Sequence, residues 1–170
     1  MKALVVYESM FGNTEVVARA VAEGLREGLA VTVVDVSGRP PVGDADLIVV
    51  GGPTHAFGMS RPQTREDARR SGEVRAGAIP VGIREWLDGS PGLAGRVAAA
   101  FDTKVDRHVP GSAAHRAGRR LRRLGCRLIV RPESFRVSGT TGPLVAGEAD
   151  RARRWGAALA AGVRGTRLPA

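Results

Sequence analysis

Three features of the sequence predict a doubly wound α/β fold built on a five-stranded parallel sheet. Short β-branched runs alternate with segments whose apolar residues recur at helical spacing. The runs are apolar almost throughout, as expected for strands covered by helices on both faces. The chain has 170 residues, 43% of them hydrophobic, which suits a single domain over residues 1–170.

The five expected strands are runs of apolar residues bounded by small or polar ones. The first run, residues 2–7, reads Lys-Ala-Leu-Val-Val-Tyr. The last run continues towards Val137 and is interrupted at Pro132, with no long insertion. The expected strands in order span residues 2–7, 31–36, 47–50, 96–101 and 127–130.

Helices are expected between these strands because apolar residues recur at intervals of three and four. Gly28 is placed to end the first helix, and Ser112 and Gly125 are suited to begin and end a later one. A further helix is expected near residues 80–88, and a short helix plus a loop within the polar stretch 60–78. The apolar faces are Val17, Ala20, Val21, Gly24 and Leu25 in the first helix, Ala113, Ala117, Leu121 and Leu124 in the later one, and Ala152, Trp155, Gly156, Leu159 and Val163 in the last.

The charge distribution is uneven. Lys and Arg number 26 against 17 Asp and Glu, a net charge of +9. Residues 1–60 hold 4 basic and 7 acidic side chains, whereas residues 104–136 hold 10 basic and 2 acidic ones. A basic region of this kind indicates a nucleic acid, an acidic protein partner, or only a composition that favours arginine.

Several classes of protein are excluded or disfavoured by composition. The single cysteine, Cys126, excludes an intramolecular disulfide and a cysteine-rich metal site. No run approaches the roughly 20 apolar residues of a membrane span, and the N-terminus lacks the apolar region and cleavage site of a secretory signal. A soluble cytoplasmic protein without a metal is therefore expected.

The loop after the first strand is suited to bind a phosphate. It contains Ser9, Met10, Phe11, Gly12, Asn13 and Thr14 and leads directly into the first helix. A helix N-terminus offers unpaired N–H groups and a partial positive charge. The loop has no Lys or Arg, so neutral donors would hold the phosphate. The alternative is a simple strand-to-helix turn capped by Asn13.

The strand, the pattern Ser-x-x-Gly-Asn-Thr and the amphipathic helix together resemble the FMN-phosphate loop of flavodoxins. The resemblance covers most of residues 1–162 and implies the strand order 2-1-3-4-5 and the short-chain form of that family. It also implies that FMN is the cofactor. Phe11 stands where the family usually has a hydroxyl residue, so one side-chain donor is lost.

The resemblance extends to the loops after the third and fourth strands. The first of these would pack against the flavin ring, with Gly58 as the candidate for a peptide that turns its carbonyl towards flavin N5, because glycine tolerates positive φ. The second would contact the polar edge of the ring. The residues so implied are Pro53, Thr54, His55, Ala56, Phe57 and Gly58, then Asp102, Thr103, Lys104 and Arg107.

The chain also departs from the usual family pattern. Trp86 and Trp155 fall on helix faces and are expected in the core, so Phe57 is the only aromatic side chain suited to stack on the ring. Family members are usually acidic, and this chain is basic. A row of arginines lines the helix before the last strand, either as a solubilising face or as a docking patch for an acidic partner. These are Arg116, Arg119, Arg120, Arg122 and Arg123.

Three functions follow from these observations. The first is an FMN-binding redox protein that carries electrons between protein partners, one of which could be acidic. The second is an FMN-dependent oxidoreductase acting on a quinone- or porphyrinogen-type substrate in a pocket built from residues 59–78. The third is a non-redox module for a phosphate ligand or a nucleic acid, which the lack of interleaved aromatics on the basic face disfavours.

Overall fold

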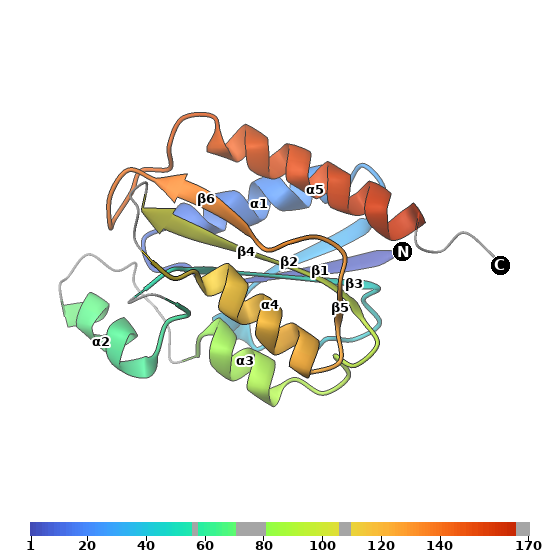
Figure 1. The fold of residues 1–170 in the computed structure, drawn as a ribbon, viewed down its shortest axis with the longest axis horizontal. Coiled ribbons are helices and arrows are strands. Elements are labelled where there is room, and N and C mark those ends of the chain that lie inside the picture. The colour runs from blue at the N-terminus through green and yellow to red at the C-terminus, as the bar shows by residue number, and fades with distance from the viewer. Residues whose placement is uncertain (56–57, 71–80, 106–109, 166–170) are drawn as a thin grey trace.

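The computed structural model describes residues 1–55, 58–70, 81–105 and 110–165. Strands and helices alternate along this part of the chain (Figure 1). They are β1 (Lys2–Tyr7), α1 (Asn13–Leu25), β2 (Ala30–Asp35), the short 3-10 helix η1 (Val36–Gly38), β3 (Leu47–Pro53), α2 (Pro62–Arg70), α3 (Ile83–Gly89), β4 (Val97–Val105), α4 (Ala113–Arg123), β5 (Arg127–Leu128), β6 (Glu133–Val137) and α5 (Glu148–Gly165).

All the strands belong to one sheet with the order β2-β1-β3-β4-β5, and β6 also pairs with β4. Every pairing is parallel. β5 pairs with the start of β4 and β6 with its end, so the two form the predicted fifth strand, interrupted around Pro132. The order confirms the predicted doubly wound sheet.

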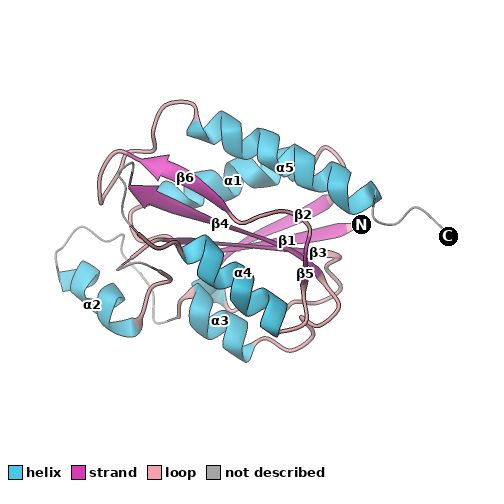
Figure 2. Cartoon of the chain, in the orientation of Figure 1, coloured by secondary structure: helices cyan, strands magenta, loops and turns pink. Residues whose placement is uncertain are grey.

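Helices cover both faces of this sheet. Figure 2 shows α1 and α5 against one face and α3 and α4 against the other. α2 lies near the end of the sheet at which β4 and β6 finish (Figure 1). This arrangement leaves the loops at the carboxyl ends of the strands accessible, which is where ligands bind in such sheets.

β1 and most of β3 are apolar because their side chains alternate between two cores. In β1, Leu4 and Val6 belong to the core under α3 and α4. Ala3, Val5 and Tyr7 belong to the core under α1 and α5. The same alternation in β3 and β4 means that each central strand contributes to both cores.

Two strands are longer than the sequence predicts. β3 continues through Gly51 and Gly52 to Pro53, because these residues pair with Phe101, Asp102 and Thr103 of β4. β4 in turn extends to Val105, where it pairs with β6. The extensions bring the loops after β3 and β4 side by side at one end of the sheet.

Both tryptophans contribute to packing, as predicted. Trp86 is buried and donates a hydrogen bond from Nε1 to the carbonyl of Pro40 at 2.9 Å. Trp155 packs edge-on against Phe101 and Phe135, with ring centroids 6.2 and 6.0 Å away. Within the described residues, no helix is both long enough and apolar enough to span a bilayer.

Candidate functional site

A cavity of about 210 Å³ lies at the carboxyl ends of β1, β3, β4 and β6. Loops far apart in the sequence meet there because the parallel strands all end at the same edge of the sheet. The cavity is lined by Met10, Phe11, Asn13, Thr14, Pro53, Thr54, His55, Thr103, Val105, Val137 and Thr140.

The loop after β1 presents amide groups to this cavity. Gly12 adopts φ 93° and precedes the first residue of α1, and glycine tolerates this backbone conformation best. The Ser9 hydroxyl accepts the N–H groups of Gly12 and Glu15, at 3.1 and 3.2 Å. The N–H groups of Asn13 and Thr14 have no acceptor among the described residues. The start of α1 therefore has the free donors that an anion requires.

Two threonine hydroxyls meet in the wall of the cavity. Thr14 Oγ1 and Thr103 Oγ1 lie 2.8 Å apart, and both residues are almost fully buried. Each hydroxyl has one proton, and their mutual hydrogen bond uses one of the two. The remaining proton can be donated to a group within the cavity.

A further wall comes from the segment that follows β6, which the sequence analysis did not include. Asn13 donates its side-chain N–H to the carbonyl of Thr141 at 2.9 Å, which ties this segment to the start of α1. A Cβ on Gly142 would lie only 2.5 Å from the Asn13 amide, so the approach depends on glycine. In the sequence, the run of small residues Ser-Gly-Thr-Thr-Gly directly after the last expected strand was the signal that this segment belongs to the site.

Asp102 lies at the predicted loop but does not line the cavity. Its side chain is fully buried, and Oδ2 accepts hydrogen bonds from Thr54 Oγ1 at 2.8 Å, Ser112 Oγ at 2.6 Å and the Ala114 N–H at 2.9 Å. The carboxylate therefore joins β4 to the loop after β3 and to the start of α4. Lys104 also has another role, because its ammonium donates to the carbonyl of Gly111 at 2.8 Å.

His55 lines the cavity on the β3 side. Its Nε2 atom is buried and has no hydrogen-bond partner within the described residues. Burial lowers the pKa of His55 below its ordinary value, because the charged imidazolium would lose solvation. The side chain is therefore neutral at pH 7, and its ring can donate or accept a hydrogen bond within the cavity.

His55 and Gly58 pair with each other through their backbones, as an isolated antiparallel bridge. The His55 N–H donates to the Gly58 carbonyl and the Gly58 N–H donates to the His55 carbonyl, both at 2.8 Å. In this state the Gly58 carbonyl, the candidate for turning towards the flavin, is already paired. Ala56, Phe57 and Arg107 lie outside the described residues.

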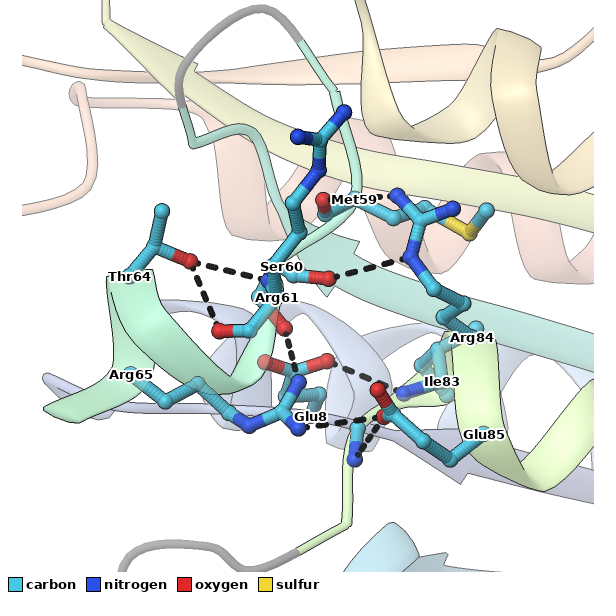
Figure 3. Close-up of polar contacts among 10 residues, drawn as sticks. Glu8, Met59, Ser60, Arg61, Thr64, Arg65, Ile83, Arg84 and Glu85 are labelled. Atoms are coloured by element: carbon cyan, nitrogen blue, oxygen red, sulfur yellow. Dashed lines mark hydrogen bonds and ion pairs between the residues drawn. The ribbon is translucent and has the colours of Figure 1, made fainter.

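A buried polar cluster supports the far side of the same loop (Figure 3). Glu8 follows β1 and is only 1% exposed, and its Oε2 accepts the N–H of Ile83 at 3.0 Å. Arg65 of α2 is 6% exposed and donates to the Ser60 hydroxyl at 2.8 Å. Arg65 also forms an ion pair with Glu85 at 3.2 Å. The cluster holds the segment after Gly58 against β1 and α3.

Burial raises the pKa of Glu8 above its ordinary value. The Ser60 hydroxyl, the Ile83 N–H and the charge of Arg65 oppose this increase without cancelling it. Because the folded chain binds this proton more tightly than the unfolded chain, protonated Glu8 favours folding. This contribution is complete below the unfolded-state pKa of about 4.5 and is lost as the pH rises through the folded-state pKa.

We therefore expect the stability of Glu8→Gln, relative to that of the natural chain, to increase as the pH rises above about 4.5, the unfolded-state pKa of Glu8. The difference in unfolding free energy should grow by at most about 1.4 kcal/mol per pH unit in the titration window. Urea unfolding of both proteins across this pH range measures it. Glu23→Gln, at an exposed position of α1, controls for the loss of a negative charge. A Glu8→Gln difference that stays constant with pH would contradict the assignment.

Comparison with known proteins identifies relatives of this fold. The family model described as Flavodoxin matches residues 5–153. A flavodoxin from the domain Archaea is 21% identical, with a TM-score of 0.67, over 96% of this chain and 99% of that chain. Oxidised flavodoxin 1 from Bacillus cereus is 19% identical, with a TM-score of 0.67, over 99% of this chain and 100% of that chain. A comparison with curated proteins found no match.

Proposed function

The chain belongs to the flavodoxin family, whose cofactor is FMN, and we propose that it carries electrons between protein partners through this cofactor. The observation that supports the proposal most directly is the set of free amide donors at the start of α1, inside the cavity between the strand ends. The N–H groups and dipole of such a helix terminus suit a phosphate even without a cationic side chain.

The residues present fit FMN at both ends of the cavity. The amides of Asn13 and Thr14 and the hydroxyl pair of Thr14 and Thr103 would hold the phosphate. At the other end, the unpartnered Nε2 of His55 is a buried polar atom that a polar group of the flavin would satisfy. Pro53 and Met10 supply apolar surface between these two ends of the cavity.

Bound FMN supplies one- and two-electron redox chemistry, and the chain contributes binding, orientation and electrostatics. Neutral His55 adds no positive charge beside the ring. The buried Met10 side chain excludes water from part of the wall. The buried cluster around Glu8 holds the segment after Gly58, next to the part of the loop that borders the cavity.

The lining residues favour an electron carrier over an oxidoreductase with its own substrate pocket. A substrate pocket was expected to use residues 59–78. Of the described residues between Gly58 and Asp102, none lines the cavity. Ser60 and Arg65 instead face the Glu8 cluster. Steady-state NAD(P)H oxidation with and without a quinone separates the two functions, because a carrier should show no quinone-dependent turnover.

The visible spectrum of the purified protein, before and after addition of FMN, tests the proposed cofactor role. We expect a flavin spectrum that is perturbed relative to free FMN and a bound ratio near one per chain. A protein that remains colourless and retains no FMN after gel filtration would overturn the proposal. In that case the cavity would serve another phosphate ligand.

Thr14→Ala should weaken FMN binding by about 3- to 10-fold, the loss expected for one hydroxyl hydrogen bond. The effect is limited because the Thr103 hydroxyl, freed from its partner, can still donate. Fluorescence titration of FMN measures the dissociation constant. Thr14→Ser keeps the hydroxyl and should retain most of the affinity. Equal affinities of all three proteins would place the phosphate elsewhere.

A further inference from the structure

A groove of about 330 Å³ lies between α3 and α4, separate from the cavity described above. Five guanidinium groups and one carboxylate surround it, from Arg84, Asp88, Arg116, Arg119, Arg120 and Arg123. The α4 arginines occupy positions i, i+3, i+4 and i+7, so one face of the helix carries all four. The groove is therefore a concave surface with a large excess of positive charge.

The protein itself neutralises only part of this charge. Arg120 pairs with Asp88 at 2.7 Å, and Asp88 is the only acid among the lining residues that the structure describes. Arg84 donates to the carbonyls of Met59 and Ser60, at 3.2 and 3.4 Å. Arg119 and Arg123 have no partner among the described residues, although they lie one helical turn apart. Like charges at this spacing destabilise a helix by about 0.2–0.5 kcal/mol, which an anionic ligand would offset.

The groove is connected to the cavity through the loop after β3. His55 lines the cavity, whereas Met59, four residues later, lines the groove. Between them, the side chain of Arg116 packs on the backbone of Gly58, where a Cβ would lie 2.4 Å from Arg116 Cδ. A molecule seated in the groove would therefore contact the same loop that borders the proposed flavin.

We propose that this groove docks an acidic segment of the protein that exchanges electrons with the bound FMN. The proposal rests on the proposed function, because it assigns the partner of the same cofactor site. Guanidinium groups bind carboxylates through two parallel hydrogen bonds, and the row along α4 matches acidic side chains spaced along a protein surface. The described part of the groove lining includes no aromatic side chain on which a nucleic acid base could stack.

A charge-reversal pair tests the groove. The probe is a fluorescein-labelled decaglutamate peptide, titrated into the FMN-loaded protein and followed by anisotropy at low ionic strength. Arg119→Glu combined with Arg123→Glu should weaken peptide binding by at least about tenfold. Arg119→Gln combined with Arg123→Gln removes the charges without adding acids next to Asp88, and should show a smaller loss.

The matched control is Arg122→Glu combined with Arg154→Glu. These exposed arginines lie outside the groove, and this pair changes the net charge by the same amount. We expect less than about a twofold loss of peptide binding from it. Equal losses in both pairs, or no binding by the natural chain, would overturn the proposal. Tighter, groove-dependent binding of double-stranded DNA than of decaglutamate would overturn it in favour of a nucleic acid.

The FMN spectrum, recorded for each variant, keeps this test separate from that of the proposed function. If FMN binds but the peptide results fail, the docking proposal alone is wrong. If FMN does not bind, the proposed function fails and the redox role of the groove fails with it, whereas the peptide titration of the FMN-free protein still reports whether the groove takes acidic segments.

Discussion

Asp102→Ala should lower the free energy of unfolding by about 3–5 kcal/mol, because it removes a fully buried carboxylate and leaves its donors without an acceptor. Oδ2 accepts hydrogen bonds from Thr54, Ser112 and Ala114. Thr54 follows β3, whereas Ser112 and Ala114 both belong to the start of α4, so Asp102 of β4 links these two segments. Urea unfolding at pH 7 measures the loss, and FMN affinity should fall with it because Thr54 lines the cavity.

Two further variants show whether the effect belongs to this hydrogen-bonding centre. Thr54→Val removes one of the three donors and also the acceptor of the Ala113 N–H, which Thr54 Oγ1 accepts at 2.8 Å. It should still cost less than Asp102→Ala. Asp67→Ala, at an exposed position of α2, should change stability by no more than about 0.5 kcal/mol. A loss below about 1 kcal/mol for Asp102→Ala would mean that Asp102 does not hold α4 in place.

The sheet was predictable because local patterns determine it. Each central strand contains a continuous apolar run, which follows from burial on both faces. Right-handed crossovers then leave few topologies. The ends of β3 and β4 were not predictable in the same way. Gly51 and Gly52 have weak strand propensity. They belong to β3 because Phe101 and Asp102 of β4 lie opposite them and Tyr7 of β1 also pairs with Gly51.

The loops of the site were predictable because polar and small residues follow each strand, but the directions of their side chains were harder to infer. Asp102 shares its face of β4 with Ala98 and Ala100, which belong to the core under α3 and α4. Glu8 continues the face of Leu4 and Val6 in the same way. The alternation along each strand therefore places both carboxylates on the α3–α4 side. Their donors come from distant segments that no local pattern identifies.

Gly156→Ala should lower the free energy of unfolding by about 2–3 kcal/mol, despite the higher helix propensity of alanine. A Cβ at Gly156 of α5 would lie 2.1 Å from the carbonyl oxygen of Val21 in α1. At Gly24 of α1, a Cβ would lie 1.9 Å from the carbonyl oxygen of Arg153. The two helices therefore approach through reciprocal glycines, and a methyl group must push their backbones apart. Urea unfolding measures the loss.

Gly162→Ala provides a control of opposite sign in the same helix. A Cβ there would lie 3.9 Å from the side chain of Ile129, an ordinary van der Waals distance. The substitution should therefore show the intrinsic helix preference alone, a gain of about 0.5–1 kcal/mol. Because both variants make the same chemical change in α5, the difference between them isolates the contact with α1. If Gly156→Ala were as stable as Gly162→Ala, the close approach of the C-terminal half of α1 to α5 would be wrong.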